Sequence, residues 1–222
     1  DSGTGTGKPN TVHLNDGTGN FDGTGRALGP GTDLTISIAV GDMDSDGDLD
    51  VVVGNEAEQN VVYFNDGTAS FPVTRTFGTG IDQTHSVAVG DLDGDGDLDI
   101  AAGNWFGDRV YLNDGVGNFD WIGGTRSLST LGGQGVALGD VDGDGDLDVF
   151  IGNMFQNIVH VNDGTASFPV TRTFGTGIDT TSSIAVGDMD GDGDLDVVVG
   201  NEGEQNVVYG NDGLGGFSVL AN

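Results

Sequence analysis

A nine-residue acidic pattern, D-x-D-x-D-G-D-x-D, occurs four times and limits the possible folds more than any other feature. The copies begin at Asp42, Asp91, Asp140 and Asp188, so successive copies are 49, 49 and 48 residues apart. Carboxylates at positions 1, 3 and 5 can converge on one point, and glycine at position 6 permits the sharp turn between them. The pattern predicts a repeat protein in which each repeat carries a loop that fits a calcium ion.

The acidic excess agrees with cation binding. The 222 residues include 36 Asp and Glu against 6 Lys and Arg, a formal net charge of −30. Because each loop holds five Asp, 20 of the 36 acidic residues lie in the loops, and four bound Ca²⁺ would change −30 to −22. Nucleic acid and anionic membrane surfaces are therefore not expected partners. The alternative is a solvated acidic turn without metal, in which the carboxylates would repel one another.

Cysteine is absent, so no disulfide framework is available. No apolar run approaches the ~18 residues of a membrane span, and no membrane insertion is expected. The chain begins without Met in a Gly/Thr/Ser-rich stretch, residues 1–7, from which we expect a processed form or a fragment. Calcium sites suit an exterior where the ion is millimolar, so we predict an extracellular or cell-surface protein.

Each repeat contains four short runs typical of β-strands. In the first repeat these are Thr35–Gly41, residues 50–54, Asn60–Phe64 and residues 71–77. No helical period occurs, and 43 glycines suit closely spaced turns. Four antiparallel strands in about 49 residues predict the blade of an all-β propeller. An open stack of sheets is the main alternative.

An Asn-Asp-Gly turn signal follows the third run, and a Phe comes six residues after each Asn. We expect these Phe residues to be packing anchors. The Asn positions are Asn15, Asn65, Asn113, Asn162 and Asn211, and the Phe positions are Phe21, Phe71, Phe119, Phe168 and Phe217.

The chain divides into a single propeller domain, or propeller fragment, over residues 1–222. It comprises a half-repeat, 1–33, and repeats 34–82, 83–131, 132–179 and 180–222. The half-repeat adds a fifth third-and-fourth strand pair to only four first-and-second pairs, so simple counting does not close a ring. The amino-terminal pair could complete the last blade by strand exchange, the chain could be part of a larger propeller, or copies could join end to end through half-blade edges.

These motifs resemble FG-GAP repeats, also described as VCBS repeats, which build the amino-terminal propeller of integrin alpha subunits and many secreted bacterial proteins. The marks are the acidic loops, the following apolar strand ending in Gly-Asn where the eukaryotic version has Gly-Ala-Pro, and the Asn-Asp-Gly…Phe segment. The resemblance covers nearly the whole chain. It implies that the metal loop joins the first and second strands of a blade, and that Ca²⁺ is held by side chains at positions 1, 3, 5 and 9 and by the carbonyl at position 7.

The resemblance thus implies four Ca²⁺ sites. The side-chain ligands would be Asp42, Asp44, Asp46 and Asp50; Asp91, Asp93, Asp95 and Asp99; Asp140, Asp142, Asp144 and Asp148; and Asp188, Asp190, Asp192 and Asp196. The carbonyl ligands would be those of Asp48, Asp97, Asp146 and Asp194. An EF-hand is excluded because position 12, where it needs Glu, is Val53, Ala102, Ile151 or Val199.

No nucleophile, base and orienting group can be assembled into a catalytic set, so we do not expect an enzyme. His13 and His160 take the place of Tyr in other repeats and are predicted to pack within strands. His85 lies at a variable position.

The repeats differ most between the second and third strands. Repeats one and four carry Glu56-Ala-Glu-Gln59 and Glu202-Gly-Glu-Gln205, whereas repeats two and three carry Trp105-Phe106 and Met154-Phe155. We hypothesise that these four apolar residues contact a protein, a glycan or another subunit on the face opposite the calcium loops; folding over the blade edge as local core is the alternative. The predicted function is a calcium-stabilised adhesion or assembly module, with a lectin or an accessory domain of a larger secreted enzyme as alternatives.

Overall fold

The computed structural model describes residues 9–29, 33–56, 58–119, 124–128, 132–178 and 180–220; residues 1–7 and Ala57 lie outside these ranges. The regular elements of the described residues are all β-strands. These residues contain no helix long and apolar enough to cross a membrane. The first nine strands are β1 (Asn10–Val12), β2 (Arg26–Leu28), β3 (Thr35–Gly41), β4 (Asp50–Asn55), β5 (Asn60–Phe64), β6 (Val73–Phe77), β7 (Thr84–Gly90), β8 (Asp99–Asn104) and β9 (Arg109–Tyr111). The next nine are β10 (Thr125–Ser127), β11 (Gly133–Gly139), β12 (Asp148–Asn153), β13 (Asn157–Val161), β14 (Val170–Phe174), β15 (Thr181–Gly187), β16 (Asp196–Asn201), β17 (Val207–Asn211) and β18 (Phe217–Val219).

Sixteen of these strands form four antiparallel four-stranded sheets, each with its strands in chain order. We call them blade 1 (β3–β6), blade 2 (β7–β10), blade 3 (β11–β14) and blade 4 (β15–β18). Strands β1 and β2 pair with each other in a separate hairpin. In blade 1, β3 and β5 have the predicted bounds, but β6 begins at Val73 and not at Phe71. The intervening Pro72 has no N–H to donate to the neighbouring strand.

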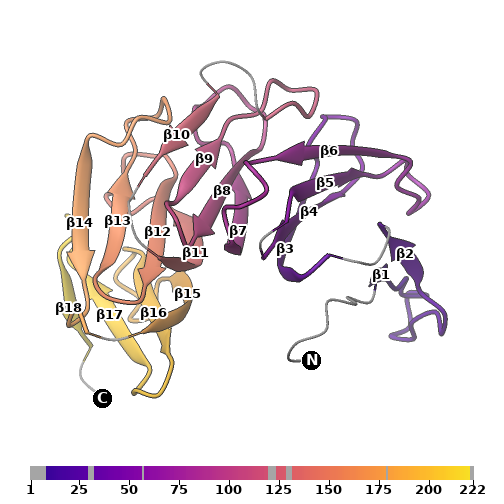
Figure 1. Ribbon diagram of the computed structural model, residues 1–222. Helices are drawn as coiled ribbons and strands as arrows, with labels where there is room; N and C mark the ends of the chain where they lie inside the picture. The colour runs from indigo at the N-terminus through magenta and orange to yellow at the C-terminus, as the bar shows by residue number, and fades with distance from the viewer. Residues whose placement is uncertain are drawn as a thin grey trace.

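The blades follow one another around an open arc, with the β1–β2 hairpin at one end and blade 4 at the other (Figure 1). The first strands of neighbouring blades are in contact, β3 with β7, β7 with β11 and β11 with β15. This is the blade arrangement of a β-propeller, and it replaces the alternative of an open stack. The predicted surplus of one outer strand pair is confirmed within the described residues, where β1–β2 lacks inner strands.

The core lies between successive blades. Between blades 1 and 2, Val52, Val62 and Phe77 pack with Val87 and Tyr111 in one buried cluster. Similar clusters join blades 2 and 3 and blades 3 and 4, and a smaller one joins the β1–β2 hairpin to blade 1. Each blade therefore buries its faces mainly against its neighbours.

The predicted Phe anchors pack against the preceding blade. Phe119 is 1% exposed and lies 6.2 Å, between ring centroids, from Phe77 of blade 1. Phe71, Phe168 and Phe217 are partly buried against the corresponding clusters. The prediction is wrong for Phe21, which is 63% exposed, because no blade precedes the β1–β2 hairpin among the described residues.

The two histidines predicted to pack within strands, His13 and His160, also differ in burial. His160 is 3% exposed and lies edge-on to Phe168, as predicted. His13 is exposed, and its Nδ1 lies 2.9 Å from the main-chain oxygen of Asp22. The packing prediction is therefore wrong for His13, which no preceding blade covers in the part of the chain that the structure describes.

Candidate metal centres

Each acidic loop joins the first and second strands of a blade, and the two strands hold its ends together. In blade 1, Gly41 pairs with Asp50 across β3 and β4. The backbone is left-handed at position 6 of every loop, where φ is 94° to 99° at Gly47, Gly96, Gly145 and Gly193. Glycine adopts this conformation without the strain that a side chain would cause. The turn folds the loop back so that its first, third and ninth residues approach one another.

The carboxylate at position 9 fixes the base of each loop. In blade 1, the N–H of Met43 donates to Asp50 Oδ2 and the N–H of Asn65 donates to Asp50 Oδ1, both at 2.8 Å. Equivalent pairs of bonds, between 2.7 and 2.9 Å, reach Asp99, Asp148 and Asp196. One buried carboxylate thus ties the acidic loop to the Asn-Asp-Gly turn of the same blade.

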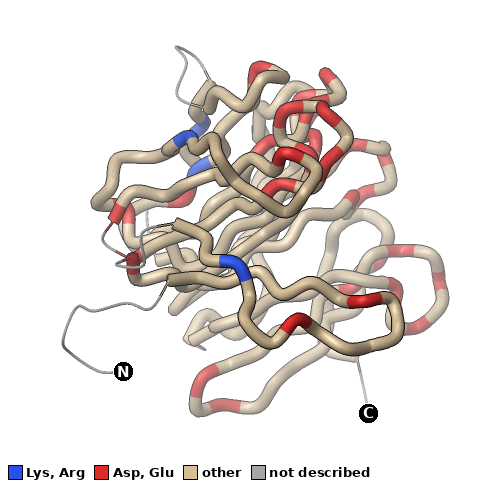
Figure 2. Tube along the Cα trace, turned by 90° about the vertical axis from the view of Figure 1, so that its right-hand side faces the viewer, with Lys and Arg blue, Asp and Glu red and all other residues tan. Residues whose placement is uncertain are grey.

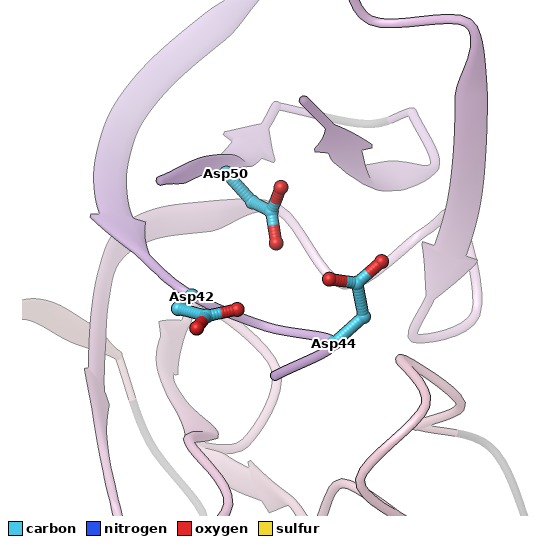
Figure 3. A group of neighbouring side chains, drawn as sticks. All are labelled: Asp42, Asp44 and Asp50. Carbon is cyan, nitrogen blue, oxygen red and sulfur yellow. The ribbon is translucent and has the colours of Figure 1, made fainter. Parts of the chain in front are cut away.

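Three carboxylates converge in every loop, those at positions 1, 3 and 9. In each group, one oxygen of each carboxylate lies within 4.8 Å of the others. Figure 3 shows Asp42, Asp44 and Asp50 of blade 1 pointing toward one another. The other groups are Asp91, Asp93 and Asp99; Asp140, Asp142 and Asp148; and Asp188, Asp190 and Asp196.

Position 5 is not among these converging carboxylates, and its role as a ligand stays a prediction. Asp46 Oδ1 accepts the N–H of Asp48 at 2.9 Å, and Asp95, Asp144 and Asp192 accept the equivalent N–H groups in their loops. The side chain of Asp48 lies against Gly67 of the Asn-Asp-Gly turn, where a Cβ would come within 2.7 Å of its carboxylate. The backbone of Gly67 is left-handed, with φ 79°, which explains why the turn carries glycine there. The carbonyl ligand expected at position 7 stays a prediction.

Burial and repulsion between the charges both disfavour the ionised form of these carboxylates. Burial, and then the charges of Asp46 and Asp42, raise the pKa of Asp44 above its ordinary value. Burial raises the pKa of Asp99 to about 7 and that of Asp148 to about 6, against two backbone N–H bonds that lower each. A bound cation would offset this repulsion.

Two buried carboxylate oxygens without hydrogen-bond donors indicate that a cation fits these groups. Asp44 Oδ1 and Asp142 Oδ1 are shielded from solvent and accept no hydrogen bond from the protein. A buried polar atom without a partner is costly, so such an atom indicates a missing ligand. With three carboxylates converging in each loop, the residues fit a hard divalent cation. Many of the Asp and Glu lie in loops on the right of Figure 2, and others lie on its left and lower edges.

The asparagines of the Asn-Asp-Gly turns have a second role that the turn signal did not reveal. Asn113 Nδ2 donates to the carbonyl of Met43, at position 2 of the preceding blade's loop, at 2.8 Å. Asn162 bonds Leu92 and Asn211 bonds Val141 in the same way. The recurrence of Asn before Asp-Gly was the available signal, but its partner lies 70 residues away.

The four apolar residues singled out in repeats two and three lie at the opposite end of the strands from the acidic loops, as antiparallel order requires. Phe106 and Phe155 are 67% and 63% exposed, and Trp105 is 37% exposed with its ring edge-on to His85. The two pairs meet at Gly132, whose N–H donates to the Trp105 carbonyl and whose Cβ position lies 4.0 Å from Met154. We call these four residues together the Trp105–Phe155 surface.

Comparison with family models finds an FG-GAP-like repeat over residues 2–53, 42–102, 101–151 and 153–199, and an FG-GAP repeat over residues 180–220. Comparison with curated proteins finds no significant relative.

Solved structures share the fold. An Agrocybe aegerita lectin, described as recognising non-reducing terminal N-acetylglucosamine, is 23% identical with a TM-score of 0.64, over 97% of this chain and 60% of its own. BBS1N, solved in complex with ARL6DN, is 18% identical with a TM-score of 0.53, over 89% of this chain and 59% of its own. The chain thus spans about 60% of the length of these structures.

Proposed function

The chain belongs to the FG-GAP-like repeat family, and from that premise we propose that it is a calcium-stabilised, non-enzymatic binding module that works outside the cell or at its surface. The observation that carries the proposal is the set of four three-carboxylate groups, two of which contain a shielded oxygen without a hydrogen-bond donor. Calcium accepts several carboxylate and carbonyl oxygens in flexible geometry, whereas magnesium demands near-ideal octahedral geometry and tends to keep its waters. Calcium is therefore the cation we assign.

The role of calcium in this proposal is structural. Each group lies between the first two strands of a blade and is tied through its ninth residue to the third strand's turn. Neutralising the group would fix three strand ends at once. Extracellular calcium is millimolar, which keeps sites of moderate affinity filled.

The three histidines support a non-enzymatic role, because each has a structural neighbour. His85 lies edge-on to Trp105, His13 bonds the main chain of Asp22, and His160 is buried against Phe168. Burial lowers the pKa of His160 to about 4, so it is neutral at physiological pH. The carboxylates at position 9 are held by backbone N–H groups in the acidic loops.

We assign partner binding to the Trp105–Phe155 surface. Exposed aromatic side chains are typical of recognition sites, and blades 1 and 4 carry Glu where blades 2 and 3 are apolar. The surface is thus confined to two of the four blades. This inequality favours one protein or subunit contact over a glycan pocket repeated in every blade.

A double variant tests this assignment. Trp105→Glu with Phe106→Ala should abolish partner binding and leave the melting temperature nearly unchanged, because both side chains are largely outside the core clusters. Val116→Glu is the matched control, since Val116 is 60% exposed at the acidic-loop end. Binding would be measured first on an array of glycans that includes terminal N-acetylglucosamine, and then by the mass of the particle in solution.

The outcomes separate the candidate functions. Glycan signal that disappears in the double variant would favour a lectin, the activity printed for the Agrocybe aegerita structure. Loss of a protein or subunit complex without glycan signal supports the proposed function. A large fall in melting temperature with undiminished binding would show that Trp105 and Phe106 are local core.

A further inference from the structure

One unbroken series of hydrogen bonds connects the acidic loops of successive blades. We number the loops as their blades: loop 1 (residues 42–50), loop 2 (91–99), loop 3 (140–148) and loop 4 (188–196). Two successive loops are joined by the Asn of the Asn-Asp-Gly turn in the later blade, which is Asn113, Asn162 or Asn211. These three residues are 2%, 3% and 6% exposed, so their hydrogen bonds are shielded from water.

Between loops 1 and 2 the joining residue is Asn113. Its main-chain N–H donates to Asp99 Oδ1 of loop 2, and its side-chain Nδ2 donates to the Met43 carbonyl of loop 1, both at 2.8 Å. The N–H of Met43 in turn donates to Asp50 Oδ2, also at 2.8 Å. One asparagine therefore connects the ninth carboxylate of one candidate metal group with the ninth carboxylate of the next.

The series continues in the same way through the other two interfaces between blades. The second residue of each loop again donates its N–H to the ninth carboxylate of that loop. The main-chain bonds are Asn162 to Asp148 at 2.7 Å and Asn211 to Asp196 at 2.9 Å, and the side-chain bonds are Asn162 to the Leu92 carbonyl at 2.7 Å and Asn211 to the Val141 carbonyl at 2.8 Å. All four groups are thus members of one series.

Further bonds hold the first joint in place. Asn113 Oδ1 accepts the N–H of Gly117 at 3.1 Å, and Asn113 Nδ2 also donates to the Leu98 carbonyl of loop 2 at 3.0 Å. Ser45 Oγ of loop 1 donates to Asp97 Oδ1 of loop 2 at 3.1 Å. Ordering either of these two loops therefore restrains the other.

We propose that Asn113, Asn162 and Asn211 are positioning residues that couple the four calcium sites, so that an ion held in one loop raises the affinity of the neighbouring loops. This coupling rests on the proposed function, because it takes calcium as the bound cation. Its physical reason is shared ordering. Filling one loop fixes its ninth carboxylate, the joining Asn and the second residue of the preceding loop, and the preceding loop then loses less conformational entropy when it fills.

Repulsion between bound ions would act in the opposite direction. It lowers the affinity of the second site, whereas ordering through the joining Asn raises that affinity. The acidic excess limits the repulsion, because the formal net charge of −30 would still be −22 with four Ca²⁺ bound. The sign of the coupling therefore distinguishes the two effects.

The glycine at position 6 of each loop can report on its own site. The four glycine N–H groups donate to the first carboxylate of their own loops, at distances between 2.9 and 3.2 Å: Gly47, Gly96, Gly145 and Gly193. A calcium titration of the full chain, stripped of metal by chelator, would follow these four amide signals separately by NMR. In the parent, each binding curve should be steeper than that of an independent site.

A thermodynamic cycle tests the coupling between loops 1 and 2. Asp93→Ala removes a carboxylate from loop 2 and should raise the calcium concentration that half-fills loop 1, read at Gly47, by about fivefold or more. In a chain that also carries Asn113→Ala, the same change should alter that concentration by less than about twofold. Because coupling between binding sites is reciprocal, Asp44→Ala should weaken loop 2 by the factor measured for loop 1.

The position of each loop in the series gives a second measurement, which needs no Asn variant. Asp93→Ala should weaken loops 1 and 3, which share a joining Asn with loop 2, more than loop 4, which does not. The measurement therefore still decides the matter if Asn113→Ala does not fold.

Asn60→Ala is the matched control, because it removes a buried amide bond between the same two blades at the end away from the acidic loops. Asn60 is 1% exposed, and its Nδ2 donates to Thr84 Oγ1 at 2.8 Å. The control should lower the melting temperature in calcium about as much as Asn113→Ala does. It should nevertheless leave the effect of Asp93→Ala on loop 1 as large as in the parent.

Equal loss of coupling in Asn60→Ala and Asn113→Ala would overturn the proposal, because the cooperativity would then come from the stability of the whole chain. Independent binding curves in the parent, or an equal effect of Asp93→Ala on loops 1, 3 and 4, would also overturn it. These results would leave calcium binding, and with it the proposed function, standing. Absence of any calcium-dependent shift at the four glycines would instead overturn the proposed function and the coupling together.

Discussion

The substitution Asp44→Asn should change the free energy of unfolding in opposite directions with and without calcium. Asp44 is at position 3 of the first loop, and its Oδ1 accepts no hydrogen bond, so an amide there breaks no existing bond of that atom. The substitution removes one charge from a group whose oxygens lie within 4.8 Å of one another. It therefore separates repulsion from metal binding.

The magnitudes follow from the spacing. Two like charges 4.8 Å apart repel by about 0.9 kcal/mol at the dielectric constant of water, so losing the pairs with Asp42 and Asp50 should stabilise the calcium-free protein by about 1 to 2 kcal/mol. A site filled at about 1,000 times its Kd contributes about 4 kcal/mol. In saturating calcium the variant should therefore be about 2 to 3 kcal/mol less stable than the parent.

Urea unfolding followed by circular dichroism, once in excess chelator and once in calcium, measures both quantities. Asp66→Asn is the control, because Asp66 lies outside the group and accepts bonds from the Thr68 N–H and hydroxyl. Asp66→Asn should change the free energy of unfolding in the same direction in chelator and in calcium. If Asp44→Asn also changed stability with one sign in both conditions, the first loop would not be a stabilising metal site.

The other predictions concern protons and the contacts between blades. In chelator, the protein should be more stable at pH 5 than at pH 7.5. Burial raises the folded-state pKa of Asp99 from 3.8 to about 7, so the stability contributed by its protonation is present at low pH and lost as pH rises through about 7. The free energy of unfolding should differ by about 2 to 4 kcal/mol between pH 5 and pH 7.5. In calcium the protein should instead be more stable at pH 7.5, because protons compete with the cation for the carboxylates. A free energy of unfolding that rises with pH in chelator would contradict the argument. Asn162→Ala removes donors to the carbonyls of Leu92 and Leu147 and should cost about 1 to 3 kcal/mol in urea unfolding. Asn65→Ala is its matched control, because Asn65 Nδ2 bonds Leu49 within its own blade, and an equal loss in both would show that the bond between blades contributes nothing.

Much of the fold was predictable because its determinants are local. The strand runs Thr35–Gly41 and Asn60–Phe64 are bounded by turn residues, and the structure reproduces both. Positions 1, 3 and 9 of each loop approach one another because the residues and the left-handed glycine that bring them together lie within nine residues. Position 5 was expected to be a further ligand, and this stays a prediction. Asp46 Oδ1 accepts the nearby N–H of Asp48, just as the two oxygens of Asp42 accept the N–H groups of Asp46 and Gly47.

The burial of a side chain by a neighbouring blade could not be predicted from the local sequence. The segments around Ile38 and Ile184 are T-I-S-I-A-V-G and T-S-S-I-A-V-G, yet Ile38 is 62% exposed and Ile184 is 9% exposed. Phe21 and Phe119 differ in the same way at equivalent positions. The sequence by itself determined the repeat, the strands and the acidic loops, because these depend on residues within one blade. The tertiary structure alone decided which copies of the same side chain are covered, because burial depends on a neighbour about 50 residues away, and among the described residues only the β1–β2 hairpin precedes the first blade.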